Sequence, residues 1–267
     1  MALSSAELQT YHDEGLVIPR FSLSSELLGA LQEDCARVIA ENPDIPPEQL
    51  ASVHFEKSPS RPEGVNGGDR IRSYGELPEI LDMVEQIIGP DIILWAATIF
   101  AKPATTGQEV PWHQDAHYWP LDPLVAMTVW IAIDDATPEN GCMRYIPGSH
   151  RSGILSHHLD ERRDVALSQA IQRSLFDESL AKDDALAAGQ MSLHDAFLIH
   201  GSNANTSGKR RAGLSFRYMP ATSYYDRNVP FRHLPGGELM PNYRPTRPLF
   251  LVRGENRNPL NDLNVGH

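Results

Sequence analysis

The residue pattern changes from helix-like to strand-like near residue 90, and this change constrains the fold more than any other feature. Before Gly89-Pro90 the patterns are helical: Ser4 and Glu7 have capping-box spacing, and "SSELLGALQEDCARVIAEN" and "LPEILDMVEQIIG" have apolar faces. After it come short β-branched or aromatic runs bounded by turn residues: "DIILWAATIFAKP", "VAMTVWIAIDD", "CMRYIP", "QMSLHDAFLIHG" and "AGLSFRYMP". Helices followed by strands predict a mainly β chain of the α+β class, built on an antiparallel sandwich or barrel.

The chain of 267 residues fits one domain, because β-barrel folds of this size are commonly single. We expect N-terminal helices over about 1–90, a strand core over about 91–220 and a Pro-, Arg- and Asn-rich wrap over 221–267. The segment "FEKSPSRPEGVNGGDR" is typical of a loop. The charged segment 154–188 is mostly helix-like, an excursion between strands.

Charge and cysteine content exclude several functional classes. A formal charge of −12 argues against a nucleic-acid or anionic-membrane partner, although a small anionic substrate stays possible in a locally basic pocket. The two cysteines suggest no disulfide framework, and Cys142 is expected to be a small core residue. The N-terminus lacks signal-peptide features, and no run approaches the about 18 apolar residues of a membrane span. We therefore expect a cytoplasmic protein.

The stretch "PWHQDAHYWPL", residues 111–121, concentrates polar groups among aromatic ones. His113 and Asp115 are two residues apart, so in a strand both side chains would project from the same face. His200, at the end of the run "FLIHG", is the best candidate for a third ligand. Two histidines and one carboxylate leave three metal positions open, which suits non-heme Fe(II), although zinc hydrolases also use such sets.

Arg211 follows His200 by 11 residues, with the turn-like "NTSGKR" between them. We expect it on the return strand of a hairpin, adjacent to His200 and facing the same cavity. A guanidinium holds a carboxylate through two parallel hydrogen bonds. The arrangement suits a dicarboxylic co-substrate that chelates the metal at one end and is clamped at the other.

The motifs "WHQD", "ENGCMRYIPGSH" and "HGSxxNxSxxxR", with the terminal "YHDEGLVIPRF" and "RPLFLVRG", resemble the phytanoyl-CoA dioxygenase family across nearly the whole chain. The resemblance implies a double-stranded β-helix, or jelly roll. It also implies an Fe(II)- and 2-oxoglutarate-dependent dioxygenase that uses O₂ to hydroxylate, or otherwise oxidise, an unactivated C–H bond of a small-molecule metabolite, releasing succinate and CO₂. The family includes halogenases in which a small residue replaces the metal carboxylate; Asp115 therefore favours hydroxylation.

The resemblance also implies roles for individual residues. His113, Asp115 and His200 match the iron ligands, and Arg211, rather than its neighbour Arg210, matches the 2-oxoglutarate clamp. Further residues are implied around the co-substrate: Ser202 as a hydroxyl that assists the clamp, Gln114 and Trp130 as pocket lining, and Lys102 in the same cavity.

The sequence also suggests positions for other polar and aromatic residues. His117 is expected at the substrate mouth or beyond the end of the strand, and Tyr118 and Trp119 as substrate contacts or packing. Adjacent strand residues point to opposite faces, so His194-Asp195 is expected to begin a strand rather than hold a metal. His150 is expected in a turn, and His157 and His158 in solvent or a lid. Three arginines are expected at the surface rather than as anchors for an anion: Arg144, Arg217 and Arg232.

Two other functional classes stay open at this point. A metal-dependent hydrolase or isomerase on a cupin-like barrel would keep the triad without needing Arg211. A catalytically silent binding protein of the same fold would keep both.

Overall fold

The computed structural model describes residues 2–229, 231–233, 239–241 and 245–267, with backbone alone for 231–233 and 239–241. Its α-helices are α1 (Ser5–Glu14), α2 (Ser25–Glu41), α3 (Gly68–Gly75) and α4 (Pro78–Ile88). The expected capping box at the start of α1 is confirmed, because Ser4 and Glu7 bond reciprocally to each other's backbone amides. Short 3₁₀ helices include η2 (Asp115–His117) and η4 (Ser149–Ser152). None of the helices in the described residues is long and apolar enough to cross a membrane.

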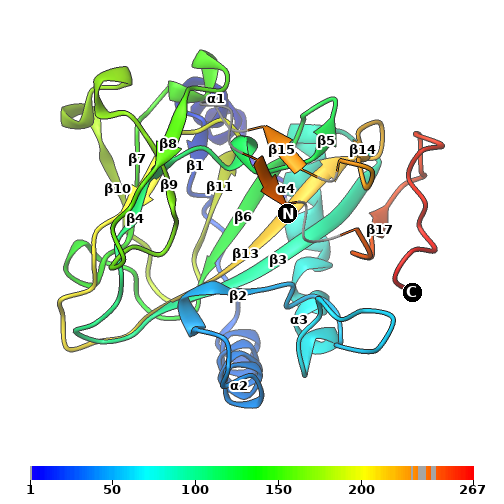
Figure 1. The fold of residues 1–267 in the computed structure, drawn as a ribbon, viewed down its shortest axis with the longest axis horizontal. Coiled ribbons are helices and arrows are strands. Elements are labelled where there is room, and N and C mark those ends of the chain that lie inside the picture. The colour runs from blue at the N-terminus through cyan, green and yellow to red at the C-terminus, as the bar shows by residue number, and fades with distance from the viewer. Residues whose placement is uncertain (1, 230, 234–238, 242–244) are drawn as a thin grey trace.

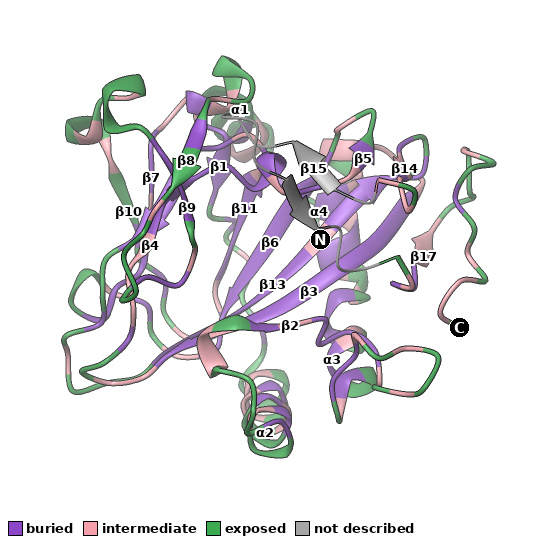
Figure 2. Cartoon of the chain, in the orientation of Figure 1, coloured by how far each residue is buried: buried purple, intermediate pink, exposed green. Residues whose placement is uncertain are grey.

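The centre of the molecule is a large antiparallel sheet (Figure 1). Its strands lie in the order β1 (Leu16–Val17), β11 (Met191–Asp195), β6 (Met127–Ala132), β13 (Arg211–Pro220), β3 (Ile92–Lys102) and β17 (Phe250–Arg253), and β2 (Leu50–Ala51) also pairs with β3. Figure 2 shows β3, β6 and β13 buried along most of their length. Because β1, β2 and β17 join this sheet, the strand core is not confined to the expected range 91–220.

A smaller antiparallel sheet has the strand order β10 (Lys182–Asp184), β7 (Met143–Tyr145), β12 (His200–Ser202) and β4 (Val110–His113). Three two-stranded pairs complete the described strands: β14 (Tyr224–Tyr225) with β5 (Leu121–Asp122), β15 (Phe231–His233) with β16 (Leu239–Pro241), and β8 (His157–Leu159) with β9 (Gln169–Ile171). The expected mainly β architecture with flanking helices is thus observed.

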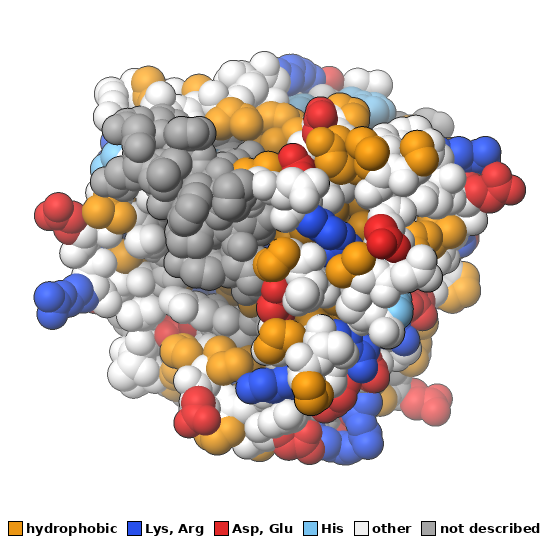
Figure 3. Space-filling model, turned by 45° about the vertical axis from the view of Figure 1, so that its right-hand side comes forward, with side chains coloured by type: hydrophobic (Ala, Val, Ile, Leu, Met, Phe, Trp, Pro, Cys, Tyr) orange, Lys and Arg blue, Asp and Glu red, His pale blue; other side chains and the backbone are white. Residues whose placement is uncertain are grey.

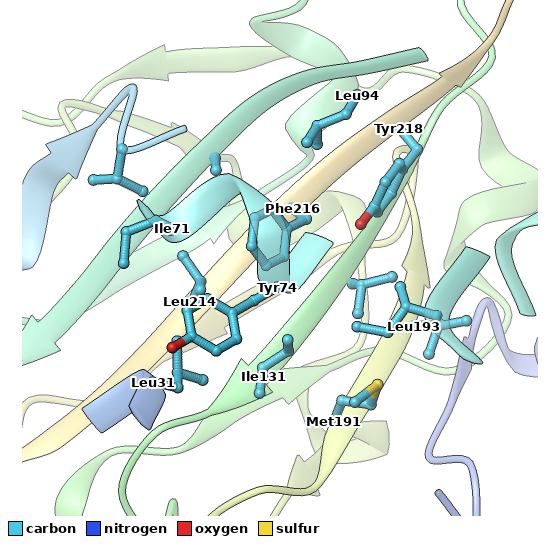
Figure 4. Close-up of a cluster of buried hydrophobic side chains, with 14 of the residues drawn as sticks. Leu31, Ile71, Tyr74, Leu94, Ile131, Met191, Leu193, Leu214, Phe216 and Tyr218 are labelled. Carbon is cyan, nitrogen blue, oxygen red and sulfur yellow. The ribbon is translucent and has the colours of Figure 1, made fainter. Parts of the chain in front are cut away.

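Alternation along the strands separates an apolar core from a polar face. On β13, Leu214, Phe216 and Tyr218 point toward the helices, where they meet Leu31 of α2 and Ile71 of α3 (Figure 4). The intervening residues of β13 face the space between the two sheets, and they include Arg211, Ser215 and Arg217. The large sheet therefore buries one face against helices and offers the other to a functional site.

Three expectations about the elements are wrong. The segment 154–188 is not mostly helical but holds the β8–β9 hairpin, short 3₁₀ turns and β10. The run "QMSLHDAFLIHG" is two strands in different sheets, β11 and β12, so His194-Asp195 ends a strand instead of beginning one. Helix α3 begins inside the expected loop, at Gly68.

The described surface mixes charges of both signs. On the face in Figure 3, Lys and Arg side chains lie among Asp and Glu side chains, with hydrophobic ones between them.

Candidate active site

A cavity of about 450 Å³ lies between the two sheets. Its walls come from β3, β6, β11 and β13 of the large sheet and from β4, β7 and β12 of the small sheet. The lining is mainly apolar and aromatic, with a few charged side chains, as is usual for small-molecule sites.

His113, Asp115 and His200 come together in this cavity, and their ligand atoms lie within 4.8 Å of one another. The pairing of β4 with β12 places His113 directly opposite His200, with ring centroids 4.2 Å apart. Oδ1 of Asp115 lies 3.8 Å from Nε2 of His113. All three side chains are buried.

Hydrogen bonds fix which ring nitrogen each histidine offers. Nδ1 of His113 donates to the carbonyl of Pro111 (2.8 Å), and Nδ1 of His200 donates to the carbonyl of Leu198 (2.9 Å). Each Nε2 is therefore left with its lone pair, as a metal ligand requires. Burial lowers the pKa of both imidazoles, which keeps them neutral. Two neutral imidazoles and one carboxylate fit Fe(II).

The second oxygen of Asp115 is held by the large sheet. Oδ2 accepts from Thr128 Oγ1 (3.3 Å) and lies 3.9 Å from Arg217 Nε and 3.8 Å from His194 Nε2. Burial alone would raise the pKa of Asp115, but Arg217 and His194 outweigh it and hold that pKa well below its ordinary range. The carboxylate is thus ionised, and its Oδ1 is directed toward the triad histidine His113.

The predicted triad converges, although not for the expected reason. Strand β4 ends at His113, and Asp115 begins the 3₁₀ helix η2, so the two residues do not share one strand face. The turn of η2 brings the carboxylate back toward His113.

A second polar group, formed by Lys102 and Arg211, faces the same cavity. The two residues are register partners on β3 and β13, and both are buried. Arg211 donates to the carbonyl of Gly141 (3.0 and 2.7 Å) and lies 3.4 Å from Ser202 Oγ. Lys102 donates to Ser202 Oγ (2.7 Å) and to the carbonyl of Asn203. Two buried basic side chains that share one hydroxyl form a cradle suited to a carboxylate.

Burial, together with the nearby Arg211, lowers the pKa of Lys102 to about 6, and burial lowers the pKa of Arg211 to about 10. Trp130 lies against this group, with the Arg211 guanidinium 5.6 Å from its ring centroid. The expected hairpin between His200 and Arg211 is wrong: β12 belongs to the small sheet and β13 to the large one. The chain crosses between sheets, and Arg211 faces the cavity from the opposite wall.

Gln114 lies outside the cavity, contrary to expectation, and His117 lies beyond the end of β4, which is one of the two places expected for it. Gln114 is fully buried, and its amide bonds to the carbonyls of Gly153 and Phe197 and to the N–H of Leu155. His117 is also buried, in η2, stacked on the ring of His157 with centroids 3.9 Å apart. Both residues pack between η2 and the segment after η4 and do not line the pocket.

His157 is likewise neither exposed nor part of a lid. Its Nδ1 donates to the Leu155 carbonyl and its Nε2 accepts from the Gln114 N–H, so the ring is neutral. Burial, assisted by His117, lowers its pKa to about 3. His158 is exposed, and His150 lies in η4 near the carbonyl of His12. Cys142 is buried, as expected.

Sequence reasoning missed two cavity residues, Arg217 and His194. Arg217 is not a surface residue, since its side chain is only 13% exposed. His194 faces the cavity beside Asp115, whereas its neighbour Asp195 caps the next turn by accepting from the Phe197 N–H. Side chains alternate between the two faces of a strand, and this alternation in β13 puts Arg217 on the same face as Arg211. In β11 it puts His194, and not Asp195, on the cavity side.

The remaining candidates divide between the cavity wall and the outer surface. Tyr118 and Trp119 line the cavity. Arg144 pairs with Asp183 (3.2 Å), and Arg210 with Asp134 (2.8 Å), both outside it. The side chain of Arg232 lies outside the described residues.

The sequence profile of the family described as "Phytanoyl-CoA dioxygenase (PhyH)" matches residues 11–213. The chain belongs to the phytanoyl-CoA dioxygenase family. This membership confirms the resemblance, and with the His-Asp-His triad it makes the protein a 2-oxoglutarate-dependent dioxygenase that uses Fe(II). The complete triad fits Fe(II), and the cradle of Lys102, Arg211 and Ser202 fits a carboxylate of 2-oxoglutarate.

Relatives in the phytanoyl-CoA dioxygenase family are distant in sequence. "Phytanoyl-CoA dioxygenase domain-containing protein 1" of Danio rerio is 27% identical over 265 residues, which cover 81% of this chain and 90% of the relative. "L-proline trans-4-hydroxylase" of Streptomyces griseoviridis is 27% identical over 194 residues, which cover 66% of each.

Solved structures confirm the double-stranded β-helix. The non-heme monooxygenase ThoJ in its apo form has a TM-score of 0.68 and 26% identity, covering 96% of this chain and 85% of that one. EctD from S. alaskensis, solved with 2-oxoglutarate and 5-hydroxyectoine, has a TM-score of 0.66 at 18% identity, covering 84% of this chain and 78% of that one. The likeness to EctD shows the fold alone.

Proposed function

We propose that the enzyme hydroxylates, or otherwise oxidises, an unactivated C–H bond of a small-molecule metabolite. The observation that carries this proposal is one cavity with two neutral histidines and a carboxylate on the small-sheet side and two buried basic side chains, Lys102 and Arg211, on the large-sheet side. Bound Fe(II) would supply, with 2-oxoglutarate and O₂, the oxidation of the C–H bond with release of succinate and CO₂. A metal-dependent hydrolase would need the triad but not Lys102 and Arg211.

Different residues of the cavity would hold the metal, the co-substrate and the substrate. His113, Asp115 and His200 would hold the metal. Arg211 and Lys102, with the Ser202 hydroxyl between them, hold the distal carboxylate of 2-oxoglutarate. Trp130 packs over Arg211 and would help to exclude water from this pair. The cavity beside Tyr118 and Trp119 is left for the substrate.

Substitution of Arg211 tests the proposal, with Arg210→Gln as a matched control. Arg211→Gln should raise the Kd of 2-oxoglutarate roughly tenfold to a hundredfold, because charge-assisted hydrogen bonds contribute about 1.5–3 kcal/mol. Arg210→Gln should leave that Kd unchanged, because Arg210 pairs with Asp134 outside the cavity. Calorimetric titration of the Mn(II)-loaded protein measures both.

Activity is the second readout. The Fe(II)-loaded wild-type protein should convert 2-oxoglutarate to succinate while consuming O₂, and a substrate screen can use the same succinate signal. Unchanged 2-oxoglutarate affinity in Arg211→Gln, or a protein that binds neither iron nor 2-oxoglutarate, would contradict the proposal.

A further inference from the structure

One cavity cation, Arg217, has no place among the proposed iron and 2-oxoglutarate contacts. It lies on the same face of β13 as Arg211. Its Nη1 donates to Thr98 Oγ1 at 2.8 Å, and its Nε lies 3.9 Å from Asp115 Oδ2. Its Nη2 makes no hydrogen bond to any residue in the described part of the chain. A guanidinium in a cavity with an unused N–H edge is a site for an oxyanion.

The counter-charge of Arg217 is shared with the metal site. Asp115 is its acidic neighbour, and the same carboxylate belongs to the triad. The second acid among the described residues of the cavity wall is Glu48. Its negative charge favours the charged forms of Lys102 and Arg211, at the co-substrate end. Arg144, by contrast, has carboxylates of its own, Asp183 and Glu178. When a metal binds Asp115, that carboxylate neutralises Arg217 less, and the guanidinium can then bind another anion.

Aromatic rings surround this cation and continue along the cavity wall. The Arg217 guanidinium lies 5.7 Å from the ring centroid of Trp119 and 5.9 Å from that of Phe100. Trp119 meets Trp95 edge to face, with centroids 5.0 Å apart. A second buried cation, Arg247, lies over Trp95 at 5.5 Å and also lines the cavity. The wall thus alternates positive charge with flat apolar surface.

We propose that the substrate is an organic anion with a flat apolar body, whose carboxylate or phosphate binds Arg217 while its body packs against Trp119, Trp95 and Phe100. The inference rests on the proposed function, because it places the substrate beside the triad. Its chemistry is the charge-assisted recognition of an oxyanion by arginine, with aromatic packing of the body.

The test uses matched probes on protein already loaded with Mn(II) and saturated with 2-oxoglutarate. Calorimetry compares 3-phenylpropionate and 2-phenylethyl phosphate with the neutral 3-phenylpropanamide. At least one anion should bind about tenfold tighter than the amide, as expected for one charge-assisted pair. Arg217→Gln should remove most of this preference, Arg217→Lys should keep part of it, and Arg144→Gln should keep all of it. The relative strength of the two anions tells a carboxylate substrate from a phosphate.

Metal and 2-oxoglutarate affinities are measured first in every variant, which separates the two proposals. Failure to bind either group in the wild type counts against the proposed function. If both bind, equal affinity for anions and amide, no binding of either anion, or a preference that survives Arg217→Gln overturns the anion site alone. A variant Arg217→Gln that weakens Mn(II) binding and leaves the anion preference intact shows that Arg217 only positions Asp115, which also overturns it.

Discussion

Lys102 is buried beside another cation, and this makes its charge dependent on the ligand. In the free protein, burial and Arg211 lower its pKa to about 6, so near neutral pH it is mostly neutral. A dicarboxylate against the same pair favours the ammonium form, because an opposite charge raises the pKa of a lysine. Binding of 2-oxoglutarate should therefore bring a proton to Lys102 at pH above about 6. Below that pH the lysine is already charged.

We predict that 2-oxoglutarate binding to the Mn(II)-loaded protein takes up as much as about one proton at neutral pH, and that affinity falls as pH rises. Calorimetry in buffers of different ionisation enthalpy measures the uptake. Lys102→Met should abolish it, whereas Lys182→Met should not, because Lys182 is exposed and pairs with Glu14. Identical proton uptake in wild type and Lys102→Met would contradict the prediction.

At the scale of residues, the sequence identified the triad and Arg211, and it also placed Lys102, Ser202 and Trp130 in the cavity, but it misplaced other neighbours. Spacing and the family motifs were sufficient for His113, Asp115 and His200. Gln114 was misplaced because the strand ends at His113, and the same strand end decides between the two positions expected for His117. Arg217 was misplaced because an arginine is ordinarily at the surface, and only the tertiary structure shows what faces it.

At the scale of elements, strand β13 has two faces with different roles. Its apolar side chains meet the helices, and its other face carries Arg211 and Arg217. Gly213 lies between them, and a Cβ added there would be 1.9 Å from Cζ2 of Trp130. Glycine at this position thus lets Trp130 pack against β13 and over Arg211.

We predict that Gly213→Ala displaces Trp130 and disturbs the co-substrate cradle. The overpacking should cost about 1–3 kcal/mol of stability, and the Kd of 2-oxoglutarate should rise. Thermal denaturation and calorimetric titration measure the two effects. Gly208→Ala is the matched control, because no heavy atom lies within 4 Å of the added Cβ. Equal 2-oxoglutarate affinity in both variants would show that Trp130 does not support the cradle.

The long strands and some short ones, such as β7 within "CMRYIP", were predictable, whereas the strands of segment 154–188 were not. The runs that became β3, β6 and β13 are rich in apolar residues that are β-branched or aromatic and are bounded by turns, so local pattern and tertiary burial agree. The segment 154–188 has little apolar periodicity, and its short strands form through pairing with partners that the local sequence does not specify. Helix α3 starts and ends with glycine, which masks its helical pattern.

At the scale of the whole molecule, the site joins two sheets that are otherwise distinct in their strand pairing. Two triad histidines belong to the small sheet, whereas Lys102 and Arg211 belong to the large one. Metal alone would connect β4, η2 and β12, because His113, Asp115 and His200 lie on these three elements. A co-substrate held at both ends would connect this group to β3 and β13 across the cavity, and binding stabilises whatever it connects.

We predict that hydrogen exchange shows two steps. Mn(II) alone should slow exchange in peptides covering 110–117 and 198–202, and adding 2-oxoglutarate should extend the slowing to 100–103 and 210–213. These ends of β3 and β13 border loops, so their local opening is measurable. Mass spectrometry of the free, Mn(II)-loaded and doubly loaded protein gives the comparison.

The Arg211→Gln variant controls for indirect effects on this pattern. Because it lacks the clamp, it should keep the metal-dependent step and lose the second one at a 2-oxoglutarate concentration that saturates the wild type. Helix α1 serves as an internal reference, since it contributes no residue to the cavity wall. If Mn(II) and 2-oxoglutarate together protect only the small sheet, the co-substrate does not span the cavity, and the assignment of Lys102 and Arg211 to its distal carboxylate fails with it.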